Sequence, residues 1–107
     1  MKRGEIWWVN FDFSIGGEIR KKRPVVIISN NVSNKFINRV QVVPLTSRTG
    51  RTYPSEAVII FEGKESKAMA DQLTTVSKER LFHRQGLVSE KDMKLVEKAI
   101  MIQLDIK

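Results

Sequence analysis

Cysteine is absent from this sequence of 107 residues, and histidine occurs once, as His83. The lack of thiols excludes disulfide bonds, thiolate catalysis and cysteine-ligated zinc or iron–sulfur sites. The single histidine excludes an acid–base pair of two histidines within one chain. No Walker-type loop or strand-to-helix GxGxxG motif is present, because Gly16-Gly17 stands alone. We therefore expect neither a metal nor an organic cofactor.

Long apolar runs are also missing, since none approaches the roughly 20 residues that a membrane-spanning helix needs. The N-terminal charges lead into a strand pattern without the apolar core of a signal peptide. We expect a cytoplasmic protein with no membrane association. The length and the 41% hydrophobic content suit one small domain over residues 1–107. Because its core is small, dimerisation is a natural way to bury more apolar surface.

Positive charge is what the sequence has in excess. Lysine and arginine number 19 against 12 acidic residues, which gives a formal charge of +7. Such an excess favours a polyanionic partner, because neutralising phosphates releases counterions. A soluble basic protein without a nucleic-acid role is the alternative.

Short segments rich in β-branched and aromatic residues alternate with polar turns along most of the chain. They predict strands over residues 5–13, 25–28, 39–45, 57–61 and 66–75. Short helical turns are expected near 32–36 and 77–81. In the first strand, Trp7, Val9, Phe11 and Phe13 share one face, so we expect a single core face there.

The last segment changes period. Met93, Val96, Ile100 and Leu104 recur at helical spacing behind a capping serine, which predicts a helix from about Glu90 to Leu104. Many short strands with one terminal helix indicate a mainly β fold, a small and strongly bent antiparallel barrel of SH3-like type.

Groups that suit phosphate gather at two strand ends. The basic run Arg20–Arg23 precedes the apolar strand at 25–28, and Thr46-Ser47-Arg48 follows the next strand. Arginine matches phosphate oxygens with a planar fork of donors, and hydroxyls add short donors. If the two strands pair antiparallel as neighbours, Arg23 meets Thr46. Ordinary solvated loops are the alternative interpretation.

Carboxylates near these strand ends would be Glu18 and Asp71. If the polyanion is RNA and the protein cuts it without a metal, the 2′-hydroxyl must attack phosphorus. The 2′-hydroxyl must lose its proton, the leaving 5′-oxygen must gain one, and the added negative charge on the phosphate must be stabilised. Arginine suits charge stabilisation better than proton abstraction, because its pKa lies above about 12.

Several motifs occur in order along nearly the whole chain. They are Lys2-Arg3-Gly4-Glu5-Ile6-Trp7-Trp8-Val9, Gly16-Gly17-Glu18, Arg23-Pro24-Val25-Val26-Ile27-Ile28-Ser29-Asn30, Val43-Pro44-Leu45-Thr46-Ser47, Ala70-Asp71-Gln72-Leu73 and the terminal helix. Together they resemble the MazF/PemK (Kid) toxins of type II toxin–antitoxin systems. The combination at this spacing is specific, although each motif alone is weak.

The resemblance implies a barrel of the CcdB/PemK type, a homodimer, and sequence-specific cleavage of single-stranded RNA without a metal. It also implies 2′,3′-cyclic phosphate and 5′-hydroxyl ends, inhibition of translation by cutting mRNA, and neutralisation by a cognate antitoxin. Arg23 and Thr46 match the family's catalytic pair. For RNA binding, the family motifs imply Gly17, Glu18, Ser47, Asp71 and Gln72, and the basic strand ends add Lys22 and Arg48.

Two positions depart from the family pattern. Thr74 stands where many members have an arginine, and Met69 stands where the Kid-like branch has one. The general base therefore stays unassigned. Two other functions remain open: a protein-targeting toxin that poisons gyrase like CcdB, and a non-catalytic nucleic-acid-binding barrel in which Trp7 and Trp8 stack on bases.

Overall fold

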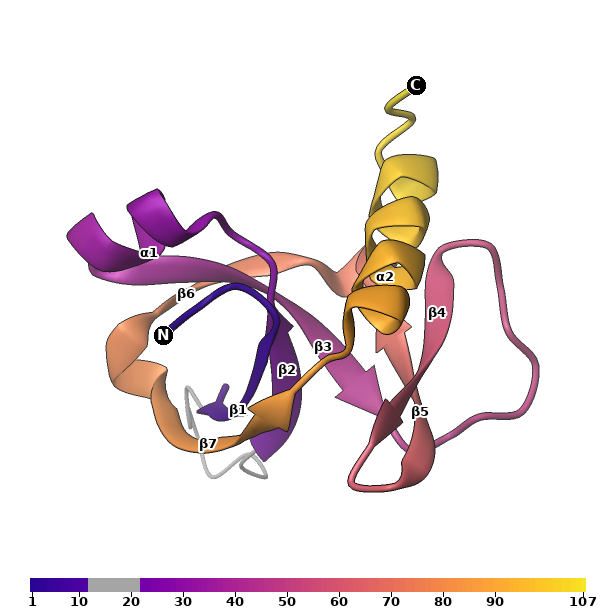
Figure 1. Cartoon of the computed structure of the whole chain (residues 1–107), viewed down its shortest axis with the longest axis horizontal. Helices are drawn as coiled ribbons and strands as arrows, with labels where there is room; N and C mark the ends of the chain where they lie inside the picture. Colours follow the sequence, from indigo (N-terminus) through magenta and orange to yellow (C-terminus); the bar gives the residue numbers. More distant parts are fainter. Residues whose placement is uncertain (12–21) are drawn as a thin grey trace, which may run out of the picture.

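The computed structural model describes residues 1–11 and 22–107. The predictions made for residues 12–21, Gly17 and Glu18 among them, lie outside the described residues. Within those ranges the strands form one curled sheet in the order β4-β5-β3-β2-β1-β7, with β6 also paired to β3 (Figure 1).

The elements follow one another in short steps along the described chain. They are β1 (Glu5–Asn10), β2 (Lys22–Ile27), α1 (Asn31–Phe36), β3 (Arg39–Thr46), β4 (Glu56–Phe61), β5 (Lys64–Met69), the 3-10 helix η1 (Ala70–Gln72), β6 (Thr74–Ser77), the 3-10 helix η2 (Lys78–Arg80), β7 (Leu81–Leu87) and α2 (Glu90–Gln103). The mainly β architecture with a C-terminal helix is confirmed.

The curled sheet buries apolar side chains on both faces. Val26 belongs to the core that the sheet forms with α2, whereas its neighbours Val25 and Ile27 belong to the core inside the curl. This alternation explains why the strand is a continuous apolar run. On β1, Val9 packs inside the curl as predicted, but Ile6 is buried in the other core. The prediction of a single core face was wrong, because α2 covers the second face.

The predicted fifth strand over 66–75 is two strands separated by η1. Along β3, Val42 pairs with Thr74 and Leu45 pairs with Ala68. An advance of three residues along β3 therefore corresponds to six residues along the segment that contains β5 and β6. The helix η1 accommodates the extra residues. The single-strand prediction was wrong because local residue pattern carries no information about this change of register.

Strand β7 was not predicted from its polar sequence. It forms because β1 offers it an edge, and its register contains two irregularities. In one of them, Trp8 pairs with His83 and Val9 pairs with Leu81, so Phe82 is the extra residue of a bulge.

The terminal helix α2 matches its prediction closely. The Ser89 side chain caps it by accepting a hydrogen bond of 3.1 Å from the Asp92 backbone N–H. The helix lies beside the sheet (Figure 1). Its residues Met93, Val96 and Ala99 are buried in the core that it shares with the sheet. None of the helices in the described part of the chain is long and apolar enough to cross a membrane.

Arg3 ties the N-terminus to the rest of the fold. Its Nε donates to the carbonyl of Ile28 at 3.0 Å, and its Nη2 forms an ion pair with Glu97 of α2 at 2.8 Å. The next residue, Gly4, donates to the Ile27 carbonyl at 2.7 Å and accepts from the Val88 N–H at 2.9 Å.

Glu5 joins the two neighbouring strands β1 and β7. Its carboxylate accepts hydrogen bonds from the Trp7 indole and the Arg84 guanidinium, each at 3.0 Å, and from the Lys2 N–H at 2.9 Å. Desolvation opposes the charged form, but these hydrogen bonds prevail and lower the pKa of Glu5.

Replacing Gly4 by alanine tests the backbone conformation between Arg3 and Glu5. Gly4 has φ of +89°, while an added Cβ would lie at an ordinary 3.6 Å from the Leu87 side chain. The cost is therefore backbone strain, and Gly4→Ala should lower the free energy of unfolding by about 1–2 kcal/mol in urea denaturation. Gly50→Ala, where φ is not positive and nothing lies near the new Cβ, is the control. Equal effects of the two substitutions would contradict the explanation.

Candidate active site

The two strand ends that carry the phosphate-friendly residues are neighbours in the sheet. β2 and β3 pair antiparallel, with Val25 opposite Pro44. Arg23 is two residues before Val25 and Thr46 is two residues after Pro44, so both lie just beyond the same end of this pairing. Arg23 and Thr46 line one surface hollow of about 350 Å³. The predicted convergence of these two residues is therefore confirmed.

The wall of this hollow combines cations, hydroxyls and an aromatic ring. Lys22 and Arg23 supply positive charge, Thr46 and Ser47 supply hydroxyl groups, and Trp8 contributes indole surface. Arg23 and Thr46 are partly buried, whereas Lys22 and Ser47 are exposed at the rim. Such a set of donors suits a phosphate diester with an attached sugar and base.

Arg23 also lines a second hollow, of about 220 Å³. Gln72 from η1 and Thr74 from β6 are in its wall. The extra residues that form η1, where the predicted fifth strand is interrupted, thus place Gln72 in the same wall as Arg23. Thr74, where many members of the resembled family have arginine, offers a hydroxyl in the same wall.

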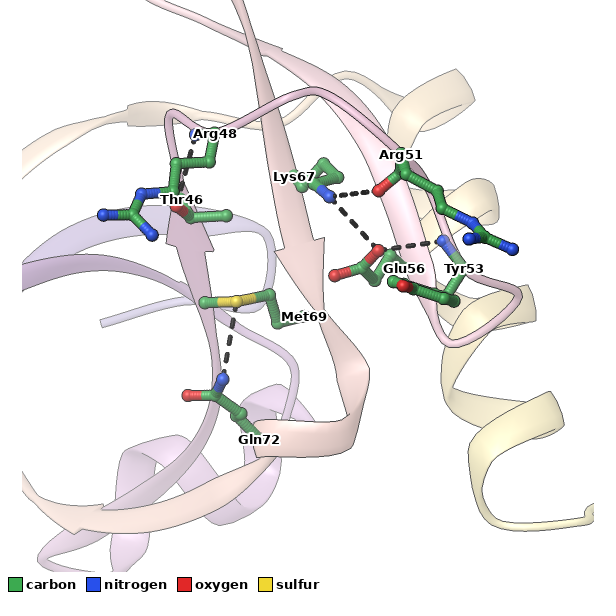
Figure 2. A network of polar contacts seen from close by, with 8 residues as sticks. All are labelled: Thr46, Arg48, Arg51, Tyr53, Glu56, Lys67, Met69 and Gln72. Carbon is green, nitrogen blue, oxygen red and sulfur yellow. Dashed lines mark hydrogen bonds and ion pairs between the residues drawn. The ribbon is translucent and has the colours of Figure 1, made fainter.

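Of the other predicted residues, the structure describes Arg48 and Asp71, which are sequence neighbours of the hollow-lining residues Ser47 and Gln72. Asp71 is exposed on η1 and is in the wall of neither hollow. Arg48 is exposed, and its backbone N–H donates to the Thr46 hydroxyl at 3.3 Å. The Gln72 amide donates a hydrogen bond of 3.5 Å to the sulfur of Met69 (Figure 2). Met69, which stands where the Kid-like branch has an arginine, therefore holds the Gln72 side chain. Among the described residues, no three histidine, aspartate or glutamate side chains cluster as a metal-binding group.

Sequence reasoning missed Lys67, which pairs with Thr46 across β3 and β5. Lys67 is only 7% exposed. Its ammonium donates to the Arg51 carbonyl at 2.7 Å and to Glu56 Oε1 at 3.3 Å (Figure 2). It therefore anchors the loop that follows Thr46 to the strand beside it. The sequence feature that could have indicated this buried lysine is its position directly before the apolar residues at the end of the strand.

Glu56 completes this anchor. Its Oε1 accepts a hydrogen bond of 2.9 Å from the Tyr53 N–H, and the Tyr53 carbonyl accepts one of 2.9 Å from the Glu56 N–H. The Arg51 guanidinium lies 5.3 Å from the centroid of the Tyr53 ring. The hydrogen bond from Tyr53, aided by Lys67, outweighs desolvation and lowers the pKa of Glu56. The loop beside the hollow is therefore held by charge-assisted bonds.

Comparison with known proteins identifies relatives over nearly the whole chain. The family described as PemK-like, MazF-like toxin of type II toxin-antitoxin system matches residues 2–104. "Endoribonuclease MazF9" of Mycobacterium tuberculosis is 32% identical over 115 residues, covering 99% of this chain and 98% of that protein. "Endoribonuclease MazF" of Staphylococcus saprophyticus is 32% identical over 111 residues, covering 99% and 92%.

Solved structures share the fold. A mycobacterial endoribonuclease in complex with its cognate antitoxin superposes with a TM-score of 0.85 at 24% identity, covering 100% of this chain and 97% of that one. A chain of the structure described as MazE-MazF (Form-II) from Deinococcus radiodurans gives a TM-score of 0.85 at 22% identity with the same coverages.

Removing the Lys67 ammonium should loosen the loop after Thr46. The ion pair with Glu56 has side chains only 9% and 13% exposed. Lys67→Met leaves a largely buried carboxylate without its cation, so the free energy of unfolding should fall by about 3 kcal/mol in urea denaturation. Lys64→Met, at an exposed position of the same strand, is the control and should change it by less than about 0.5 kcal/mol. A Lys67→Met protein as stable as this control would show that the ion pair anchors nothing.

Glu56 also predicts a pH dependence. Its pKa is lowered from the ordinary 4.5 by folding, so its contribution to stability is present above that value and is lost as the pH falls through the lowered pKa. Glu56→Gln should therefore flatten the acid limb of the curve of unfolding free energy against pH below about 5. Glu79→Gln, at an exposed acid, serves as the control. Superimposable acid limbs for the wild type and Glu56→Gln would contradict the assigned shift.

Proposed function

The chain belongs to the family of PemK-like, MazF-like toxins of type II toxin–antitoxin systems, and from this we propose that it is an endoribonuclease that cuts single-stranded RNA. Two relatives that carry the name endoribonuclease align with it from end to end, which supports the activity. The observation that carries the proposal is the hollow on which Arg23 and Thr46 converge. The charge of +7 suits a polyanionic substrate.

We propose the following chemistry at this hollow. The 2′-oxygen of one nucleotide bonds to the adjacent phosphorus while the bond from phosphorus to the 5′-oxygen breaks. The 2′-hydroxyl gives up its proton, and the leaving 5′-oxygen gains one. The products are a 2′,3′-cyclic phosphate and a 5′-hydroxyl, and no metal ion takes part.

Arg23 and Thr46 have separate roles in this step. The Arg23 guanidinium stabilises the negative charge that develops on the phosphate oxygens. Because Arg23 is partly buried, its charge acts on the phosphate with less screening by water. The hydroxyls of Thr46 and Ser47 add short hydrogen bonds to the same oxygens.

RNA on either side of the scissile phosphate would be held by residues around the two hollows. We assign this role to Lys22, Ser47 and Gln72, which line them, and to Arg48 and Asp71 beside them. Gly17 and Glu18, outside the described residues, are proposed from the family motif alone.

Further properties of the family complete the proposal. Residues 1–107 would act as one toxin domain, assemble as a homodimer, cut mRNA in the cytoplasm and so inhibit translation. A cognate antitoxin would neutralise the toxin, as the solved relatives with bound antitoxins suggest.

Incubating the purified protein with a long RNA and excess EDTA tests the activity itself. Discrete cuts whose fragments carry 5′-hydroxyl and 2′,3′-cyclic phosphate ends are expected. RNA that stays intact but tightly bound would instead indicate a non-catalytic RNA-binding barrel. Inhibition of gyrase without RNA cleavage would indicate a protein-targeting toxin.

Substitution of the central pair tests the assignment of roles. Arg23→Ala removes the charge that stabilises the transition state, so kcat should fall by about 10²–10³-fold with the fold intact. The matched control is Arg39→Ala, an exposed arginine at the opposite end of β3, which should cut RNA at close to the wild-type rate. Wild-type cleavage by Arg23→Ala would refute the assignment.

Thr46→Val keeps the shape of the side chain but removes its hydroxyl. We expect kcat/KM to fall by about 5- to 100-fold if that hydroxyl bonds the phosphate, since a hydrogen bond to a charged group is lost. Thr75→Val, an exposed threonine on β6, is the control. Equal rates for the two variants in an initial-rate assay would rule out a contact from Thr46.

A further inference from the structure

Phe82 is a large apolar side chain that the fold leaves 52% exposed. It is the extra residue of the β7 bulge, between Leu81, which pairs with Val9, and His83, which pairs with Trp8. Bulges re-aim side chains and are common beside functional sites. Leu81 is buried in the core, so the bulge separates an inward-facing residue from the exposed ring that follows it.

This ring adjoins the candidate active site through Lys22. The Lys22 ammonium lies 5.6 Å from the centroid of the Phe82 ring. Lys22 also lines the hollow of about 350 Å³ together with Arg23 and Trp8. An ammonium and a guanidinium on β2 and a hydroxyl at the end of β3 thus line one hollow, and the aromatic ring on β7 lies beside its ammonium.

This combination of groups suits single-stranded RNA. Its backbone presents phosphates at intervals, and its unpaired bases present flat faces beside them. Proteins that bind single strands combine cations for the backbone with aromatic rings on which bases stack.

Another exposed aromatic residue lacks this arrangement and so provides a comparison. Phe36 is 74% exposed and has Lys35 near its ring, but the two are neighbours in sequence on α1. Phe36 lines neither of the two hollows that contain Arg23. The contact between Lys22 and Phe82, by contrast, joins strands that are far apart in sequence and ends at the candidate active site.

We propose that Phe82 forms a base-stacking subsite for a nucleotide close to the scissile phosphate, with Lys22 neutralising the phosphate between that base and Arg23. The inference rests on the proposed cleavage of single-stranded RNA and extends it to a residue that the family motifs do not include. Because stacking holds the ground state and the transition state alike, Phe82 acts on KM and leaves kcat unchanged.

Steady-state cleavage of a short fluorogenic RNA by Phe82→Leu tests this subsite. Leucine keeps an apolar side chain but removes the flat face, so KM should rise at least about fivefold while kcat stays within about twofold. Phe82→Trp should retain the wild-type KM. Phe36→Leu is the matched control for loss of an exposed phenyl ring and should leave both constants unchanged. Circular dichroism and thermal melting check that each variant is folded.

Abasic substrates locate the stacked base. Each nucleotide next to the cut is replaced in turn by an abasic residue. One position should raise KM for the wild type by the same factor as Phe82→Leu, and should have no additional effect in that variant. The proposal is wrong if Phe82→Leu leaves KM unchanged, or if the abasic and protein effects multiply at every position. It is also wrong if light scattering shows that the substitution changes the oligomeric mass, since Phe82 would then be a subunit contact.

Failure of the proposed function gives a different result. If the wild type cuts no RNA, binding of a non-cleavable 2′-O-methyl oligonucleotide is measured by fluorescence anisotropy. Weaker binding by Phe82→Leu than by Phe36→Leu would then support the stacking subsite alone, and equal binding would overturn it.

Discussion

Antiparallel pairing of β2 with β3 is the constraint on which the candidate site depends. Consecutive residues of β2 are buried in two different cores, with Val26 facing the helix side and its neighbours facing the inside of the curl. A slip by one residue would exchange these faces and put each apolar side chain into the core that is packed for its neighbour. Burial therefore sets the register, and the pairing ends at Val25 and Pro44, so that Arg23 and Thr46 both lie just beyond it and line the same hollow. The packing of apolar side chains in the two cores therefore positions the polar residues of the candidate site.

β3 also organises the second half of the site, because it is paired along both edges. β2 lies on one edge, while β6 and β5 share the other in succession. The surplus residues between those two strands form η1, which delivers Gln72 to the wall that contains Arg23. Lys67, opposite Thr46 on β5, anchors the following loop through Glu56. A break in regular structure and a largely buried ion pair thus serve one purpose, which is to hold polar groups beside the strand end.

Membership of the PemK-like, MazF-like toxin family and this geometry support the same proposed activity. The family match covers residues 2–104, and the hollow gathers cations and hydroxyls without a histidine pair. In the proposed reaction, charge stabilisation by arginine is the central catalytic contribution. The two departures from the family pattern also have defined places, since Thr74 lines the second hollow and Met69 accepts the Gln72 amide. The proposed stacking of a base on Phe82, beside Lys22, extends the proposed RNA-binding surface beyond the family motifs.

Local sequence determined the features that arise from periodicity, capping and strand ends. It predicted α2 with its Ser89 cap, the central apolar strand, and the meeting of Arg23 with Thr46 once neighbouring strands were assumed to pair. These features depend on residues close together in the chain. Tertiary structure alone decided the break at η1, the existence of β7, and the contacts made by Lys67 and Phe82. The physical reason is that strand register, bulges and long-range ion pairs depend on which segment lies alongside, and neither period nor propensity encodes that partner.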